Sequence, residues 1–442
     1  MKRTKLMAAV LAAVLTLSMA GCGNEVSDPD SSRAAKDTTA SASSQEDSSE
    51  AQSSASEKET DSSVSESETT TTTTSKASDS SETTTTASES SSQAGTEKTT
   101  TTTKQASATT TKAQTAPQTT TTTAATKATT PAANGKETFS VPQSGQWIGG
   151  VVVCDRNLGP KIRGLISFGG NESLAQYFCS MVNDMKKMVG SGVNVYTMGA
   201  PVSSAFYTPK GMTGVTTDQH KAITDLNKFL RSDVKNVDTY AVLAPHASEY
   251  IYYRTDHHWT ELAAYYAAEA FAKTAGVPFK TLSEMQAGVK KGFTGSMHYY
   301  SNCQEFLTYP DTYYYWKPKN SYTTTYYNGY FQGARAGSLF YDWATGSSCY
   351  LSVLGTDDTI AEIKTDVKNG RTLVLFKDSY GNALVPYFVG SFEKIYVLDM
   401  RYTHVGLKNF YKQVGATDIL FGSSLSSFYT TSRADGIRAL MY

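Results

Sequence analysis

The sequence predicts an α/β protein built on a parallel β-sheet with covering helices, preceded by a long segment that forms no core of its own. Short apolar runs that favour strands alternate with longer stretches whose apolar residues recur at helical spacing. This alternation occurs twice, over residues 193–243 and again over residues 373–421. A tyrosine-rich stretch of different character separates the two blocks.

The first 22 residues are predicted to be a bacterial lipoprotein signal peptide. A short basic start, Met1 to Lys5, precedes an apolar run from Leu6 to Leu17, which is too short for a stable membrane span. Small residues then lead to Cys22 in a pattern that resembles a lipobox. We expect lipidation of Cys22 to anchor the mature protein outside the cytoplasmic membrane, whereas ordinary cleavage near Ala20 would leave a free cysteine.

Residues 23–137 are predicted to form a disordered stalk. Serine and threonine dominate and large apolar side chains are scarce, so this segment cannot bury enough apolar surface to offset its chain entropy. The threonine runs 70–74 and 119–123 are candidates for O-glycosylation. A flexible coil of roughly 115 residues spans on the order of 60 Å. We therefore expect a spacer between the membrane and a domain at residues 138–442.

Charge and cysteine content exclude several classes of function. The chain carries 40 basic and 41 acidic residues, so it has no electrostatic footprint for nucleic acid or anionic membranes. Four cysteines fall in the domain without Cys-x-x-Cys spacing, which argues against a zinc site. A disulfide is compatible with an extracytoplasmic location, but the sequence does not pair these residues: Cys154, Cys179, Cys303 and Cys349.

Helix boundaries and strand patterns place the elements of the domain in order. A helix is expected between Asn171 and Gly190, with core-filling residues at helical spacing: Leu174, Phe178, Met181, Met185 and Met188. Thr260 is the expected N-cap of a second helix. The predicted strands are 150–154, 193–198, 237–243, 373–376, 395–398 and 419–421, and the predicted helices are 171–190, 218–230, 260–275 and 407–414.

Residues 280–370 are interpreted as an antiparallel β insertion. Tyr313–Trp316, Tyr322–Tyr327 and Tyr330–Phe331 indicate short strands, with a turn at Asn328-Gly329. Their tyrosines could form a sugar-facing platform, and packing of sheet residues on one another explains them equally well.

The candidate catalytic residues begin with the run Thr255-Asp256-His257-His258-Trp259. In an extended loop alternate residues point the same way, so Asp256 and His258 are expected to share one side and His257 to face the other. An acid beside an imidazole holds the histidine in the orientation that a general base needs. We therefore expect His258 to be the base, with His257 as the alternative, in a loop just beyond a strand end.

The matching nucleophile is predicted at Ser379, where an apolar strand runs into a small polar turn at residues 378–382. A serine at a strand-to-helix turn can offer its backbone N–H to a developing oxyanion, and the Asn382 amide is a candidate second donor. Tyr380, next to the serine, is expected to contribute to substrate binding.

Two further charged residues lie near this turn in the sequence. Asp378 is adjacent to the nucleophile and is expected to support the turn, although it could compete with Asp256 as a charge partner. Arg401 follows the next predicted strand and either binds an anionic sugar or forms a structural ion pair.

The block Thr255–Trp259 resembles the signature of the bacterial DHHW protein family. Together with the serine turn, it is similar to the alginate O-acetyltransferase-type members of the SGNH hydrolase-like group. The resemblance covers most of residues 150–442 and implies a three-layer, flavodoxin-like fold in which the Asp-x-His block precedes the serine. Carried over by position, it implies that Ser379 is the nucleophile, that His258 is the general base and that Asp256 is the acid that orients the base. His257 occupies the family's variable position.

These expectations combine into a lipid-anchored, extracytoplasmic serine acyltransferase that O-acetylates a polysaccharide without a cofactor. The resemblance implies a membrane-embedded acyltransferase as the partner that supplies acetyl groups. The alternatives are a carbohydrate esterase with the same three residues and a glycan-binding surface lipoprotein without turnover. A metal-dependent phosphoesterase is disfavoured, because the sequence lacks the further Asp and His clusters that such enzymes need.

Overall fold

The computed structural model describes residues 139–442. The predicted signal peptide, the lipidation site at Cys22 and the stalk therefore lie outside the described residues. Between residues 139 and 442, no helix is both long and apolar enough to cross a membrane.

An eight-stranded mixed sheet, ordered β5-β4-β13-β11-β12-β10-β8-β9, forms the centre of the fold. Its first five strands are parallel, and the last three run antiparallel to their neighbours. The parallel strands are β4 (Asn194–Ala200), β5 (Val234–Asn236), β11 (Thr372–Lys377), β12 (Lys394–Asp399) and β13 (Asp418–Ser424). The antiparallel strands are β8 (Tyr322–Tyr327), β9 (Arg335–Gly337) and β10 (Ile360–Thr365).

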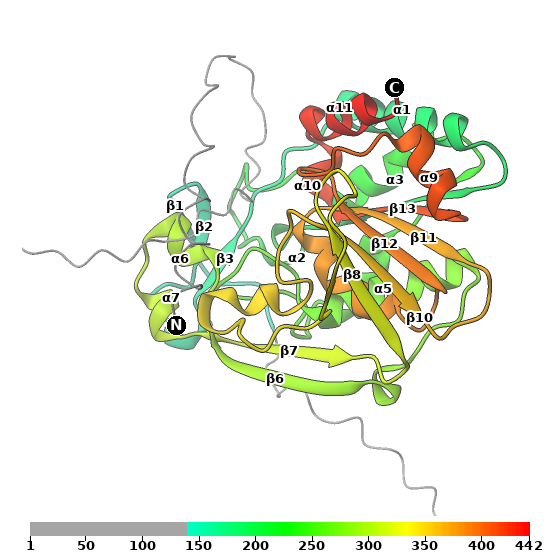
Figure 1. Cartoon of the computed structure of the whole chain (residues 1–442). Helices are drawn as coiled ribbons and strands as arrows, with labels where there is room; N and C mark the ends of the chain where they lie inside the picture. Colours follow the sequence, from blue (N-terminus) through cyan, green and yellow to red (C-terminus); the bar gives the residue numbers. More distant parts are fainter. Residues whose placement is uncertain (1–138) are drawn as a thin grey trace, which may run out of the picture. The chain divides into compact units, whose positions relative to one another are not determined.

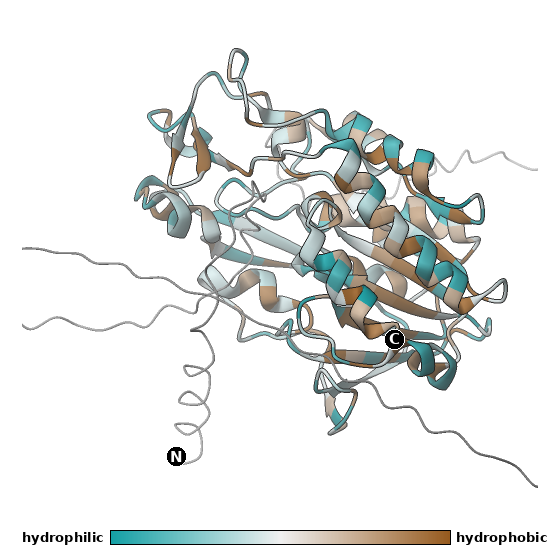
Figure 2. Ribbon diagram, turned by 90° about the horizontal axis from the view of Figure 1, so that it is seen from above, coloured by the Kyte–Doolittle hydropathy of each residue, from teal (hydrophilic) through white to brown (hydrophobic). Residues whose placement is uncertain are grey.

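Helices cover both faces of this sheet, which gives three layers (Figure 1). One face carries α1 (Glu172–Val189), α3 (Gln219–Phe229), α9 (Leu407–Val414) and α11 (Thr431–Leu440), and the other carries α5 (Glu261–Ala275). The covering helices mix hydrophilic and hydrophobic residues along their length (Figure 2), as expected for amphipathic helices that turn one side to a core. Aromatic contacts bind the layers, because Phe178 of α1 stacks on Phe428 and Phe271 of α5 meets Tyr196 of β4 edge-on.

Shorter elements complete the fold beside this sandwich. An antiparallel three-stranded sheet and a two-stranded ribbon lie outside the main sheet. The strands are β1 (Gly145–Ile148), β2 (Val151–Cys154), β3 (Arg163–Leu165), β6 (Gln286–Phe293) and β7 (Asp311–Lys317). The short helices are α2 (Ser204–Tyr207), α4 (Thr239–Leu243), α6 (Ser296–Ser301), α7 (Glu305–Thr308), α8 (Val385–Phe388) and α10 (Leu425–Phe428).

Local sequence signals placed the longest helices correctly. The Asn171 side chain accepts a hydrogen bond from the Leu174 N–H and caps α1, and Thr260 caps α5 in the same way. Gly276 ends α5 in the left-handed conformation that glycine adopts without strain. The strands predicted near residues 193, 373, 395 and 419 are present as β4, β11, β12 and β13.

The strand predicted over residues 237–243 is wrong. This stretch forms α4, preceded by the three-residue strand β5. The Asp238 side chain accepts a hydrogen bond from the Ala241 N–H at 3.0 Å and so starts a helix within an apolar run that favours a strand. Residues 151–154 do form a strand, but it belongs to the small antiparallel sheet rather than to the parallel one.

The tyrosine-rich stretch does not stand apart from the core. Strands β8, β9 and β10 extend the main sheet, and only β6 and β7 pair separately. Tyr313 and Tyr326 are buried among core residues, while Tyr330 and Phe331 lie in a turn instead of a strand. Packing therefore explains the buried tyrosines, whereas Tyr330 is largely exposed.

The four cysteines of the domain are buried thiols, and none of the described ones forms a disulfide. Burial raises the pKa of Cys154 and Cys179 to about 12. Both side chains therefore stay protonated at neutral pH and pack as small apolar groups.

Truncating the aromatic contact beneath the sheet tests this core. Phe178→Ala removes a buried ring whose centroid lies 4.0 Å from that of Phe428. We expect this variant to lose about 3–5 kcal/mol in the free energy of unfolding, measured by urea titration. The control Tyr299→Ala changes an aromatic residue that is 64% exposed and should cost less than about 0.5 kcal/mol. If the two variants lost the same amount of unfolding free energy, the assignment of Phe178 to the core would be contradicted.

Candidate active site

The candidate site lies where β11 ends, at the carboxyl edge of the parallel strands. Ser379 lies two residues after the end of β11 and opens a short 3-10 turn over residues 379–384, which Asp378 caps. The chain returns from β12 to the opposite side of β11, because β13 pairs with β11 on the edge away from β12. Such a switch in strand order leaves room above the sheet, which is where open α/β folds place their ligands.

The loop with the two histidines is bent rather than extended. Tyr252 and Trp259 form an isolated antiparallel bridge, and the Thr260 N–H donates to the Ile251 carbonyl at 3.0 Å. Between these contacts the chain makes a compact loop, and the His258 N–H donates back to Asp256 Oδ1 at 3.0 Å. The segment before this loop is not a strand of the main sheet, so the expected position beyond a strand end is incorrect.

Ser379, His258 and Asp256 form a continuous line of side-chain contacts. Ser379 Oγ lies 2.6 Å from His258 Nε2, and His258 Nδ1 lies 2.5 Å from Asp256 Oδ1. All three residues are almost fully buried, with 3%, 5% and 5% of their surfaces exposed. A serine in hydrogen-bond reach of a histidine that an acid orients is the arrangement of an activated nucleophile.

The Asp256 carboxylate is held in its charged form. Burial alone would raise its pKa, but the charges of His258 and His257 and hydrogen bonds from His258 and the Ser296 N–H outweigh burial and lower the pKa. The Ser296 N–H donates to Asp256 Oδ2 at 2.8 Å, while Oδ1 faces His258. Both carboxylate oxygens are therefore fixed, which also fixes the plane of the His258 ring.

His257 does not face away from His258, which corrects the expectation from an extended loop. The two imidazole centroids are 3.8 Å apart, and His257 Nδ1 lies 2.6 Å from Ser296 Oγ. Ligating atoms of Asp256, His257 and His258 all lie within 4.8 Å of one another. This cluster has the donors for a metal ion, but the His258 nitrogens face Asp256 and Ser379, so a metal would have to displace these contacts.

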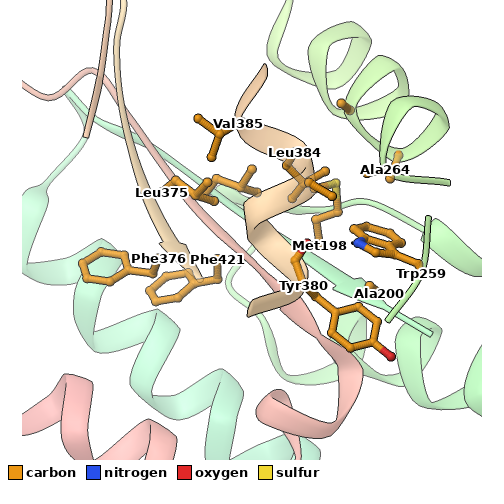
Figure 3. Packing of buried hydrophobic residues seen from close by; sticks show 14 of the residues in the cluster. Met198, Ala200, Trp259, Ala264, Leu375, Phe376, Tyr380, Leu384, Val385 and Phe421 are labelled. Atoms are coloured by element: carbon orange, nitrogen blue, oxygen red, sulfur yellow. Dashed lines mark hydrogen bonds between the residues drawn. The ribbon is translucent and has the colours of Figure 1, made fainter. Parts of the chain in front are cut away.

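Trp259 and Tyr380 join the histidine loop to the serine turn. Trp259 Nε1 donates to the Tyr380 carbonyl at 2.9 Å, and the Tyr380 hydroxyl donates to the His257 carbonyl at 2.5 Å. Figure 3 shows the two rings beside each other at the edge of the apolar core. Tyr380 is thus buried and acts as a bridge in this structure, and its contribution to substrate binding stays a prediction.

Asp378 supports the serine turn and does not compete with Asp256. Its carboxylate accepts hydrogen bonds from the Tyr380 and Ser424 N–H groups, each at 3.0 Å. The hydroxyls of Ser424 and Ser427 donate to its other oxygen. These contacts anchor the turn to the end of β13.

Asn382 and Arg401 belong to a buried polar cluster next to the serine. Asn382 Nδ2 donates to Asp357 Oδ1 at 2.9 Å. The Arg401 guanidinium contacts Asp399 and Asp357, as the structural ion-pair alternative expects. Their roles toward an oxyanion or an anionic sugar stay predictions.

Two features of the site had no signal in the sequence. The Tyr350 ring stacks on His258 with centroids 3.6 Å apart and an interplanar angle of 10°. Gly295 lies against Asp256, since a Cβ added at Gly295 would be 2.2 Å from both Cβ and Oδ2 of Asp256. Ser296 and Tyr350 come from segments about 40 and 90 residues downstream of the histidine loop, so only the fold brings them to it.

Glu261, the first residue of α5, is a second buried acid near this site. The Tyr253 hydroxyl donates to its carboxylate, and burial raises the pKa of Glu261 to about 7 despite this hydrogen bond. The folded protein therefore favours the neutral acid more than the unfolded chain does.

This shift predicts a specific dependence of stability on pH. Because the unfolded chain ionises Glu261 near pH 4.5 and the folded protein only near pH 7, stability falls as the pH rises through this interval, by about 2–3 kcal/mol from this group. In Glu261→Gln that part of the fall should vanish when free energies of unfolding are measured at pH 5 and pH 8. An unchanged difference between the two pH values would show that Glu261 is not the titrating group.

Comparisons with known proteins show the family of this chain. A family model for the DHHW protein matches residues 133–398, which is more than half of the chain. The crystal structure of a DHHW family protein from Eubacterium siraeum is 39% identical, covers 68% of this chain and 98% of its own, and has a TM-score of 0.64. A comparison with curated proteins finds no significant match.

PatB1, a more distant protein, shares the fold. PatB1 of Bacillus cereus, solved with a sulfonyl adduct, is 16% identical over 64% of this chain and 98% of its own, with a TM-score of 0.53. The O-acetyltransferase domain of Pseudomonas putida AlgJ is 13% identical over 67% of this chain and 97% of its own, with a TM-score of 0.39. Together, the Asp256-His257-His258-Trp259 signature, the family model and the Eubacterium siraeum structure place this chain in the DHHW protein family.

Proposed function

We propose that this protein is a serine acyltransferase that uses Ser379, His258 and Asp256 to move an acetyl group to a hydroxyl of an extracytoplasmic glycan. The observation that carries this proposal is the unbroken line of contacts from Ser379 Oγ through His258 to Asp256, at 2.6 and 2.5 Å. PatB1, which has the same fold, was captured with a sulfonyl adduct, and sulfonylation is a reaction of activated nucleophiles.

In the first half of the reaction His258 Nε2 takes the proton of Ser379 Oγ as the oxygen bonds to the acyl carbon. Asp256 stays ionised, because its pKa is lowered, and stabilises the imidazolium that forms. The Ser379 N–H, at the start of the 3-10 turn, is the candidate donor to the oxyanion; loss of such a donor typically costs about 2.7–4 kcal/mol. The bond to the leaving alcohol then breaks, and His258 returns the proton to that alcohol.

In the second half a sugar hydroxyl loses its proton to His258 and attacks the acetyl-serine. The ester bond to Ser379 breaks, and the serine regains its proton from His258. If water takes the place of the sugar, the same residues make a carbohydrate esterase. In our proposal a lipid anchor at Cys22 holds the domain outside the membrane, where a membrane-embedded acyltransferase supplies the acetyl donor.

The acyl-enzyme can be tested with p-nitrophenyl acetate. The full-length protein should release a burst of nitrophenol and gain one acetyl group on Ser379, visible by mass spectrometry. Ser379→Ala should abolish the adduct, and His258→Ala should lower kcat/KM by at least about 10³-fold, because serine and base act as a unit. If neither variant changes turnover and no adduct forms, the acyl-enzyme is refuted and a glycan-binding surface protein is the better description.

Gly295 should be a positioning residue for the same chemistry. An alanine Cβ would push the Asp256 carboxylate from its place, and a displacement of about 1 Å can cost on the order of 10²-fold in rate. Gly295→Ala is therefore expected to lower kcat by about 10–100-fold with little change in KM. The control is Gly192→Ala, where nothing lies within 4 Å of the added carbon; equal kcat in the two variants would count against the proposed orienting role of Asp256.

A further inference from the structure

Two buried cations and two carboxylates meet beside Ser379. Lys377 Nζ lies 2.7 Å from Asp357 Oδ1 and 2.8 Å from Asp399 Oδ2. Arg401 Nη2 lies 2.9 Å from Asp357 Oδ2 and 2.8 Å from Asp399 Oδ2. The Lys377 and Arg401 side chains are only 1% and 7% exposed, so these charges interact far more strongly than they would in water.

The two carboxylates differ in how the fold holds them. Asp399 is the last residue of β12, is fully buried and also accepts a hydrogen bond from the Arg401 N–H. Asp357 lies in the surface loop between residues 353 and 359, and its side chain is 16% exposed. Its carboxylate enters the cluster from outside and accepts hydrogen bonds from Lys377, Arg401 and Asn382.

The groups around the Asp357 carboxylate are those that bind an anion in a protein. Arg401 offers a planar guanidinium, Lys377 a compact charge, and Asn382 an amide N–H. Lys377 and Arg401 each contact both carboxylates, so removing Asp357 would take away one carboxylate that faces both cations. Asn382 adds an acceptor, because its Oδ1 is buried and has no hydrogen-bond partner among residues 139–442. A hydroxyl next to the anion of a ligand could donate a hydrogen bond to Asn382 Oδ1.

The position of this cluster links it to the candidate nucleophile. Lys377 comes two residues before Ser379, and Asn382 lies three residues after it in the same 3-10 turn. Two of the residues that would hold an anion therefore flank the candidate nucleophile in the chain, one at the end of β11 and one in the 3-10 turn.

We propose that the Asp357 carboxylate occupies an anion-binding subsite, formed by Lys377, Arg401 and Asn382, that takes a singly charged group of the glycan. This inference rests on the proposed function, which supplies the glycan. The ligand chemistry is a carboxylate, as in a uronic acid, or a sulfate ester. In this proposal binding exchanges one oxyanion for another: the Asp357 carboxylate leaves, and the anion of the acidic sugar accepts hydrogen bonds from Lys377, Arg401 and Asn382 in its place.

Binding can be tested without any turnover. In full-length Asp357→Ala the subsite is empty, and sodium acetate should raise Tm by roughly 2–4 °C more than sodium chloride at equal ionic strength. The matched control Asp358→Ala removes the adjacent exposed acid and should show no acetate-specific shift, like the wild type. Asp357→Ser serves the same purpose if the alanine variant does not fold. A folded variant that responds equally to acetate and chloride would overturn the subsite.

Sugar probes test which anionic group binds and whether Arg401 holds it. D-glucuronate and glucose 6-sulfate carry the two candidate groups, and glucose is the neutral probe. In Asp357→Ala one acidic sugar should inhibit p-nitrophenyl acetate hydrolysis at least about 10-fold more strongly than glucose does, and adding Arg401→Gln should remove this difference. Equal inhibition by all three sugars would overturn the proposal.

The acetate and sugar experiments, together with the esterase assay, separate this inference from the proposed function. If the wild type has no esterase activity but Asp357→Ala shows the acetate-specific rise in Tm, the subsite stands and the acyl-enzyme does not. If p-nitrophenyl acetate is hydrolysed through Ser379 but neither acetate nor an acidic sugar binds selectively, the catalytic proposal stands and Asp357 is only a structural anchor for its loop.

Discussion

The structure around the candidate site depends on one constraint, which is that the buried Asp256 must remain a carboxylate. A buried ion is stable only if hydrogen bonds and opposite charges replace its water. Here two imidazoles and the Ser296 N–H do so, and a glycine at position 295 leaves the space for it. The loop itself is anchored by Asp311, whose carboxylate accepts the N–H groups of Arg254 and Thr255. Each of these contacts restricts where His258 can point.

The same loop is locked to the serine turn from the other side. The Trp259 indole donates a hydrogen bond to the Tyr380 carbonyl, and the Tyr380 hydroxyl donates to the His257 carbonyl. The Tyr350 ring covers the flat face of His258. Asp378 ties the turn to β13. The side chains that would react thus sit between rigid elements, which limits the reorganisation needed during a proton transfer.

The antiparallel half of the sheet bears on the site as well. Strand β10 follows the loop of Asp357 and pairs with β12, which ends at Asp399. The chain between β9 and β10 therefore supplies both Tyr350 and Asp357, one against the histidine and one against the buried cations. This tyrosine-rich stretch contributes core packing and places Tyr350 against His258, while a sugar-facing role of its tyrosines stays a prediction.

Local signals in the sequence determined much of this protein. Caps at Asn171 and Thr260 set the helix starts, apolar runs set β4, β11, β12 and β13, and the Asp-x-His spacing with a serine at a strand end indicated the candidate site. Only the tertiary structure decided the turn of His257 toward its neighbour and the contacts of Ser296, Tyr350 and Asp357. The physical reason is distance along the chain: the partners of His258 include a residue 121 positions away, and such contacts follow from packing, which no local pattern records.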